Sequence, residues 1–357
     1  MLAKGVIVAS TSAADTARRP PLDPRLAASL VPVANRPILF HALEAMREAG
    51  IADVAIVCCE TTADEVRSAV GDGAQWGLHL THLDVDRTDG PAAPLQAAQE
   101  FVEDGPFIFQ RGDGLLGDAL SSFSGLLEED RPDVVLLVHR QLARRRRAEL
   151  ESRRLLRAAG VHVVPGMTGV AGVYLFGAGA LRGARRALGT GADGMGIADI
   201  VEHVTQSGGR VHVRPVRDWR RYTGDVQDLL EMNRIVLDEL DREVDETEDR
   251  GNRIHGRVVI HPTAHLESSV VRGPVIIGAG ARVVDAYIGP YTAIGEGVRV
   301  EGAEIEHSII LSGASILHIG GRLEASVVGR GAKVYRDFSL PRALRLQVGD
   351  GVEVALC

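Results

Sequence analysis

The sequence is poor in cysteine, the residue that cross-links small secreted domains through disulfides and often holds metal clusters. Its 357 residues include three cysteines, Cys58, Cys59 and Cys357. Three are too few for a disulfide framework, and they lack the spacing of metal ligands. Lysine is scarcer still, because Lys4 and Lys333 are the only lysines among 40 basic side chains. A site in this chain that needs a cationic side chain must therefore rely on arginine.

Long apolar runs and a targeting signal are also missing. No stretch approaches the roughly 18 consecutive apolar residues that span a membrane. The first ten residues lack the basic region and long apolar core of a secretory signal. A net charge of −8 argues against general binding of nucleic acid or anionic membranes, because such partners recruit a basic field. We therefore expect a cytoplasmic protein with neither kind of partner.

Residues 1–240 alternate between short apolar runs and segments with helical spacing. The runs GVIVAS, VAIVCC, FIFQ, DVVLLVH, AGVYLF and RVHVRPV predict buried strands. Apolar spacing of three to four predicts helices in PILFHALEAMREAG, TTADEVRSAVG, PLQAAQEFVED and DLLEMNRIVLDEL. This alternation is typical of an α/β fold with a mainly parallel sheet. Ligands of such folds bind at the carboxyl ends of strands, so the loops after GVIVAS and FIFQ are the first candidates for a site.

The pattern changes near residue 240. Residues 241–252 are strongly acidic and predict a linker, and residues 253–357 follow a short period. In that region aliphatic residues recur every five or six positions, as in a parallel β-helix whose coils each place one aliphatic side chain in the core. These positions are Ile277, Val283, Ile288, Ile294, Val300 and Ile305. Assembly and domain packing are the first interpretation of this repeat, and acyl transfer is the alternative.

Ordered segments along nearly the whole chain resemble the sugar-1-phosphate nucleotidyltransferases. They include LVPVANRPILFHALEAMREAGI at 30–51, FIFQRGDGLL at 107–116, GVAGVYLFGAGAL at 169–181 and YTGDVQDLLEMNRIVLDEL at 222–240. The repeat RGPVIIGAGARVVDAYIGPYTAIGEGV at 272–298 extends the resemblance to the long form of glucose-1-phosphate thymidylyltransferase. The resemblance implies a Rossmann-like nucleotidyltransferase domain followed by a left-handed parallel β-helix.

The resemblance also implies a reaction and its site residues. In the family, a sugar 1-phosphate attacks the α-phosphorus of dTTP, which gives dTDP-glucose and pyrophosphate. Such transfers need in-line positioning, cations around the phosphates and a divalent metal held by carboxylates. The motif positions imply Arg18 and Asp113 as catalytic residues, Asp113 also as a ligand of Mg²⁺, and Gly90, Gly112 and Asp199 as substrate- or cofactor-binding residues. A helix-capping role is the structural alternative for Asp199.

Several motif positions depart from the family pattern. No glycine stands between Gly5 and Gly50, where the family has its glycine-rich phosphate loop, and Ala28 replaces the phosphate-binding lysine. The second metal-binding aspartate is replaced by Tyr222, whose phenol is a poor ligand for Mg²⁺. Rescue by Asp218 or Asp225 would require a shifted register. At the sugar end, residues 163–165 read Val-Val-Pro where the family has Glu-Lys-Pro.

These departures lead to two classes of function. The first prediction is a nucleotidyltransferase-family protein whose catalysis is reduced or lost, binding a nucleoside triphosphate and a sugar 1-phosphate or nucleotide sugar. The alternatives are an active nucleotide-sugar synthase that uses replacement residues, and a regulatory paralogue in a mixed oligomer. We expect a homo-oligomer or an oligomer mixed with an active paralogue. The arginine-rich run at 140–157 predicts either a solvated helix face or a site for an acidic partner.

Overall fold

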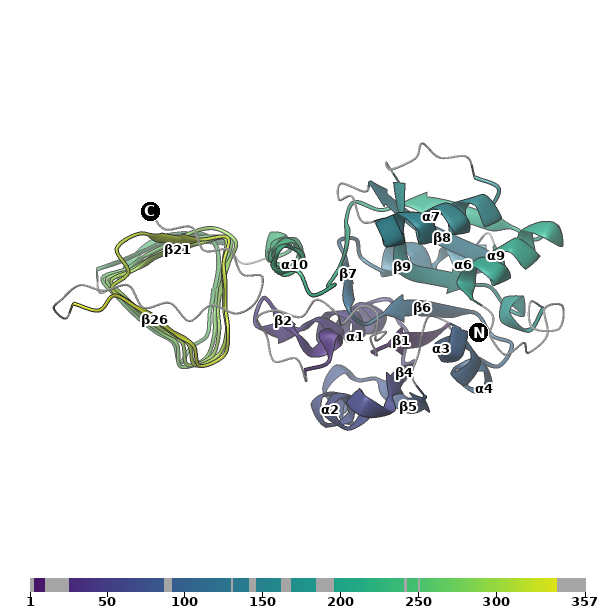
Figure 1. Ribbon diagram of the computed structural model, residues 1–357, viewed down its shortest axis with the longest axis horizontal. Helices are drawn as coiled ribbons and strands as arrows, with labels where there is room; N and C mark the ends of the chain where they lie inside the picture. The colour runs from purple at the N-terminus through teal and green to yellow at the C-terminus, as the bar shows by residue number, and fades with distance from the viewer. Residues whose placement is uncertain are drawn as a thin grey trace.

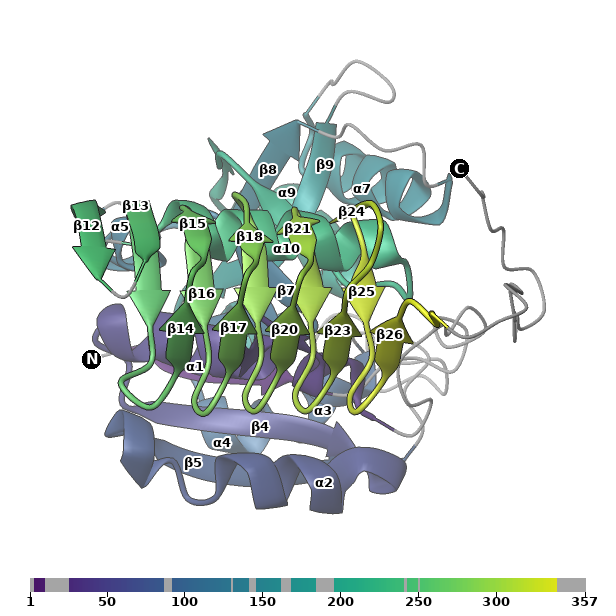
Figure 2. The ribbon, with the colours of Figure 1, turned by 90° about the vertical axis from the view of Figure 1, so that its left-hand side faces the viewer.

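The computed structural model describes residues 3–9, 26–86, 92–129, 131–140, 146–161, 168–183, 196–240, 243–249 and 251–338. An α/β domain and a triangular β-helix lie side by side, with helix α10 between them (Figure 1). The same two parts are seen from the side of the β-helix in Figure 2, where its coils form a regular stack. The fold class predicted from the sequence is confirmed.

A seven-stranded sheet forms the centre of the α/β domain, in the order β10-β8-β9-β6-β1-β4-β5. All neighbours are parallel except β9, which runs antiparallel to β6 and β8. The strands are β1 (Lys4–Val8), β4 (Asp53–Cys59), β5 (His79–Val85), β6 (Phe107–Arg111), β8 (Val134–Arg140), β9 (Thr168–Phe176) and β10 (Val211–Pro215). Two ribbons flank the sheet, β2 (Pro32–Val33) with β3 (Arg36–Pro37) and β7 (Gly114–Leu116) with β11 (Trp219–Arg221).

Helices cover both faces of this sheet because its strands are apolar on both sides. Along β1, Ile7 packs into one core, whereas Val6 and Val8 pack into the other. The first core receives α1 (Ile38–Glu48), α2 (Glu60–Val70), α5 (Ser121–Ser124) and α6 (Leu126–Glu129). The second receives α3 (Ala92–Ala97), α4 (Gln99–Val102), α7 (Arg146–Ala158) and α9 (Ile197–Gln206). Short 3-10 turns lie at Ala28–Leu30 and Ala74–Trp76.

Every strand predicted from an apolar run is present, and the predicted helices are present as α1, α2, α3 with α4, and α10 (Val226–Asp238). Strand β5 was not predicted, because its sequence HLTHLDV is largely half-exposed and polar and gives no continuous apolar run. The reversed direction of β9 was also not predicted, since an apolar run carries no information about strand direction.

The β-helix is built of parallel strands that stack coil upon coil (Figure 2). The aliphatic positions picked out by the short period, from Ile277 to Ile305, are at most 1% exposed and form its core. Its strands are β13 (Asn252–Ile260), β14 (His265–Glu267), β15 (Val270–Arg272), β16 (Val275–Ile277), β17 (Arg282–Val284), β18 (Tyr287–Ile288), β19 (Thr292–Ile294), β20 (Arg299–Glu301), β21 (Glu304–Glu306), β22 (Ile309–Ile310), β23 (Ser315–Leu317), β24 (Arg322–Glu324), β25 (Val327–Val328) and β26 (Lys333–Tyr335).

The acidic segment at 241–252 contains a strand that its composition did not predict. Residues Glu243–Asp249 form strand β12, which pairs antiparallel with β13. The hairpin lets this segment satisfy its backbone hydrogen bonds against the first coil, so acidic composition did not prevent strand formation. That residues 241–252 act as the linker between the two domains stays a prediction.

An apolar cluster joins the two parts of the molecule. It combines side chains of α10, such as Leu229 and Met232, with Val33 of the α/β domain and with Ile309 and Leu311 of the β-helix. The fully buried Asn233 of α10 adds a polar bridge. Its Oδ1 accepts a hydrogen bond from the Ala34 N–H (2.9 Å), and its Nδ2 donates to the Tyr291 carbonyl (2.9 Å). Among the described residues, no helix is both long and apolar enough to cross a membrane.

We predict that Asn233→Ala destabilises the protein by about 2 kcal/mol or more, because it leaves the buried Ala34 N–H and the partly buried Tyr291 carbonyl without their partner. Chemical denaturation monitored by circular dichroism measures the change. Gln227→Ala, at an exposed position of the same helix, is the matched control and should stay within about 0.5 kcal/mol of the parent protein. Equal stability of the two variants would contradict the bridging role.

Candidate functional site

The site is centred on Asp113, which follows β6 in the turn RGDG. Strand β6 lies next to β1, and just after it the Gly112 N–H donates a hydrogen bond to the Val8 carbonyl (2.9 Å). A Cβ at Gly112 would lie 3.0 Å from Ile7 Cγ2 and 3.1 Å from Val8 O, so a side chain there would push the strands apart. Asp113 is 1% exposed and lies at the carboxyl end of β6, the position predicted for a site.

Two arginines hold the Asp113 carboxylate. Arg111 donates from Nε to Oδ1 and from Nη2 to Oδ2, each at 3.2 Å. Arg221, in β11, donates from Nε to Oδ2 at 2.9 Å. Burial alone would raise the pKa of Asp113, but the two guanidinium groups outweigh it and lower the pKa below its usual value. Asp113 is therefore an anion whose two oxygens both accept hydrogen bonds from arginine.

The β7–β11 ribbon explains why Arg221 reaches Asp113. Arg221 pairs with Gly114 across this ribbon, and the next residue, Tyr222, donates its backbone N–H to the Asp113 carbonyl (2.9 Å). The Tyr222 side chain is 7% exposed and belongs to the apolar cluster between the two parts of the molecule. Successive side chains of an extended segment point to opposite sides, so an arginine faces Asp113 and the phenol packs elsewhere.

Two glycines make room for this arrangement. A Cβ at Gly172 would lie 2.9 Å from Arg111 Cδ and 2.5 Å from a ring carbon of Trp219. A Cβ at Gly114 would collide with the same indole. Tyr174 lies on the same strand as Gly172, and burial raises its pKa to about 12, so its phenol is neutral at pH 7. The absence of side chains at Gly172 and Gly114 thus leaves room for Arg111 and Trp219 beside Asp113.

The two alternative acids, Asp218 and Asp225, both make hydrogen bonds with other groups. Asp218 pairs with Gly117 across the ribbon, four residues along from Asp113, which is about 13 Å at strand spacing. Its carboxylate accepts from Arg234 Nη2 at 3.3 Å. Asp225 caps α10 by accepting from the Gln227 N–H (3.0 Å). Within the described part of the chain, no group of three or more His, Cys, Asp or Glu side chains is placed to hold an ion.

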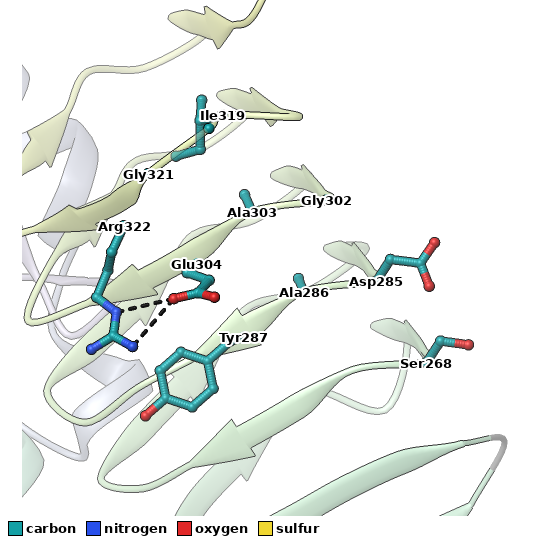
Figure 3. A pocket seen from close by; sticks show the side chains of 11 residues that line it. Ser268, Asp285, Ala286, Tyr287, Gly302, Ala303, Glu304, Ile319, Gly321 and Arg322 are labelled. Carbon is teal, nitrogen blue, oxygen red and sulfur yellow. Dashed lines mark hydrogen bonds and ion pairs between the residues drawn. The ribbon is translucent and has the colours of Figure 1, made fainter. Parts of the chain in front are cut away.

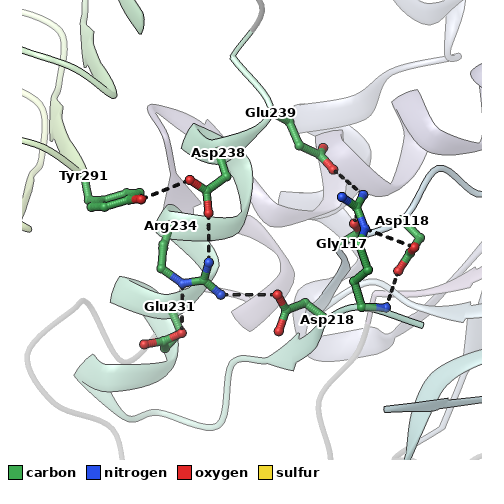
Figure 4. Close-up of polar contacts among 9 residues, drawn as sticks. Gly117, Asp118, Asp218, Glu231, Arg234, Asp238, Glu239 and Tyr291 are labelled. Carbon is green, nitrogen blue, oxygen red and sulfur yellow. Dashed lines mark hydrogen bonds and ion pairs between the residues drawn. The ribbon is translucent and has the colours of Figure 1, made fainter. Parts of the chain in front are cut away.

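Arg234 of α10 is the centre of a second polar network, shown in Figure 4. Besides Asp218, its guanidinium binds Glu231 (3.3 Å) and Asp238 (2.8 Å). Asp238 also accepts from the Tyr291 hydroxyl of the β-helix at 3.1 Å. The loop that leads into β11 is therefore tied through α10 to the β-helix.

The other predicted site residues have separate positions. Asp199 lies at the start of α9, where Oδ2 accepts from the Gly196 N–H (2.9 Å) and Oδ1 from Arg154 Nη2 (2.7 Å). Its carboxylate serves the helix end, and a role in substrate binding stays a prediction. Arg154 belongs to α7, so one arginine of the basic run pairs with an acid of a neighbouring helix, as expected of a solvated helix face. Ala28 lies in the 3-10 turn that precedes β2.

Arg18, Gly90 and residues 163–165 lie outside the described residues. Arg111 and Arg221 were not predicted from the sequence, although Arg111 lies two residues before Asp113 in RGDG and Arg221 directly precedes Tyr222 in RRYTG. A groove of about 670 Å³ also lies on the outside of the β-helix. Tyr287, Glu304 and Arg322 line it, and Arg322 donates to Glu304 (Figure 3). Its lining comes from the β-helix alone.

We predict that Asp113→Asn destabilises the protein by about 3–5 kcal/mol. The substitution removes the carboxylate from a buried ion cluster and leaves the positive charges of two arginines without the anion that paired them. Asp53→Asn, at an exposed aspartate that contacts His79, is the control and should change stability by less than about 0.5 kcal/mol. Urea denaturation at pH 7 measures both, and similar values would contradict the prediction.

The contribution of Asp113 to the stability of the protein depends on pH in a defined direction. Because the native pKa of Asp113 lies below its unfolded value, its contribution is complete above about pH 4 and is lost as the pH falls through the native value. The stability difference between the parent protein and Asp113→Asn should shrink below pH 4. A difference that stays constant down to pH 2 would contradict the lowered pKa.

Comparison with known proteins places this arrangement in a family. Residues 16–145 match the nucleotidyl transferase family. A glucose-1-phosphate thymidylyltransferase of Streptomyces griseus is 36% identical over 339 residues, which cover 92% of this chain and 94% of the relative. The enzyme of the same name from Streptomyces antibioticus is 33% identical over 344 residues, with coverage of 94% and 95%.

The fold has a counterpart among solved structures. A crystal structure from Bacillus anthracis, assigned as a glucose-1-phosphate thymidylyltransferase in complex with sucrose, aligns with a TM-score of 0.53 at 18% identity. The alignment covers 69% of this chain and 97% of that one. At this identity the likeness concerns the fold, and the sequence relatives carry the assignment. The chain belongs to the nucleotidyl transferases, in the family of the glucose-1-phosphate thymidylyltransferases.

Proposed function

We propose that this chain is a nucleotidyltransferase-family protein in which metal-dependent nucleotidyl transfer is severely reduced or lost. The observation that carries the proposal is the state of Asp113, whose two carboxylate oxygens both accept hydrogen bonds from Arg111 and Arg221. Mg²⁺ favours anionic oxygen ligands. Two guanidinium groups take three of the roughly four acceptor positions of this carboxylate, which leaves an ion little free coordination. Tyr222 contributes no carboxylate at the second position.

The described residues therefore do not fit Mg²⁺ at the position that the family resemblance implies. Coordination at Asp113 would require the carboxylate to exchange buried hydrogen bonds with two arginines for bonds to the ion. Loss of one well-aimed charge-stabilising group typically lowers a rate by about 10²–10³. In this chain the glycine loop, the phosphate lysine, the second carboxylate and the Glu-Lys pair all differ from the family pattern.

Binding of the family's ligands does not require the complete transfer machinery. We propose that the chain still binds a nucleoside triphosphate, a sugar 1-phosphate or a nucleotide sugar, in the cytoplasm. We also propose that it works as an oligomer, either of identical chains or with an active paralogue. The intact core of the β-helix supports a role in assembly, because a packed repeat domain can serve assembly without any chemistry.

The test is pyrophosphate release by the purified full chain with Mg²⁺, glucose 1-phosphate and each nucleoside triphosphate in turn. The Streptomyces griseus relative serves as the positive control. We expect turnover at least about 10²-fold below that of the relative, because several charge-stabilising groups are replaced. Folding is checked by circular dichroism before the comparison is made.

Asp113→Ala separates true turnover from contamination in the same assay. Rates in the ordinary enzyme range of about 1–10³ s⁻¹ that disappear in Asp113→Ala would overturn the proposal. Such a result would favour the alternative, an active nucleotide-sugar synthase that uses replacement residues.

A further inference from the structure

The cluster of Arg111, Asp113 and Arg221 has the charge of a cation. Two guanidinium groups and one carboxylate sum to a net charge of +1, and arginine keeps its proton at every physiological pH. The Asp113 side chain is 2% exposed, whereas those of Arg111 and Arg221 are 25% and 21% exposed. The anion is therefore buried beneath two cations that still reach solvent.

This charge differs from that of a site built to hold a metal. Two carboxylates without their ion carry a charge of −2 and repel phosphate, so such a site depends on the ion to become attractive. The present cluster is positive without any ion. A divalent cation placed beside it would meet two like charges, which disfavours its binding.

The N–H donors of the two arginines also match the hydrogen-bond acceptors of a phosphate group. A guanidinium group has five N–H donors in a planar fork that matches phosphate oxygens. Arg111 directs the edge formed by Nε and Nη2 at Asp113, which fixes the plane of the fork and leaves Nη1 on the side away from the carboxylate. The aliphatic part of Arg111 rests against Gly172, which limits its movement. Fixed orientation lowers the entropy lost when a ligand binds.

We infer that Arg111 and Arg221 form a phosphate-binding site that works without a divalent cation, with Asp113 as the positioning residue that holds both arginines. The ligand class is a phosphate-bearing molecule, either the polyphosphate of a nucleotide or a sugar phosphate. The inference deepens the proposed function and rests on it, since it assigns a ligand chemistry to the same site. The two arginines occupy the role that the family gives to the metal.

The first test needs no variant. Isothermal titration calorimetry measures binding of dTTP, inorganic tripolyphosphate and glucose 1-phosphate to the full chain, once in EDTA and once in excess Mg²⁺. We expect at least one of these probes to bind in EDTA with an affinity equal to or higher than that in Mg²⁺. Binding of tripolyphosphate would identify a polyphosphate site, and binding of glucose 1-phosphate alone would identify a sugar-phosphate site.

Variants then locate the site. Arg111→Leu should weaken binding in EDTA about tenfold or more, because it removes a charged donor, and Arg111→Lys should weaken it less because it keeps the charge. Arg322→Leu, on the β-helix, is the matched control and should bind as the parent protein does. Circular dichroism of each variant verifies folding, and the comparison of EDTA with Mg²⁺ in the parent protein stands even where a variant fails to fold.

The outcomes separate this inference from the proposed function. Binding that appears only with Mg²⁺, equal binding by Arg111→Leu and the parent protein, or no binding of any probe would each overturn the inference while leaving the loss of turnover unaffected. Ordinary turnover together with binding in EDTA would overturn the proposed function and leave the metal-independent site in place.

Discussion

The ion cluster around Asp113 is the interaction on which the character of this site depends. A buried carboxylate is costly to desolvate unless it is paired and hydrogen-bonded. Here two arginines from distant parts of the chain supply both conditions, one from the end of β6 and one from β11. The same hydrogen bonds that make the carboxylate tolerable in the interior occupy both of its oxygens.

The cluster is also connected mechanically to the rest of the molecule. Arg221 ends the short strand β11, and the residue before that strand, Asp218, is held by Arg234 of α10. Through Asp238, the same network reaches Tyr291 in the β-helix. The β-helix is therefore more than an appended assembly module, because it helps to fix the helix that in turn fixes the β11 segment.

The sequence predicts much of the fold but only part of the site. Apolar runs and the short period located the strands of the sheet and the core of the β-helix, because burial imposes those patterns directly. Resemblance located Asp113. It could not reveal the pairing of Asp113 with Arg221, since the two residues are 108 positions apart. Only the register of the β7–β11 ribbon brings them together. The same register sets Asp218 opposite Gly117, four residues along from Asp113.

Strand β12 has a consequence for how copies of this chain can associate. It is the edge of its sheet among the described strands, pairing with β13 alone, and five of its seven residues, EVDETED, are acidic. An open β edge is a template for adding another chain, and charge on the edge opposes such growth. Two molecules meeting end to end at β12 would place like charges opposite each other. We therefore expect like-charge repulsion to disfavour end-to-end growth of the coil stack at β12.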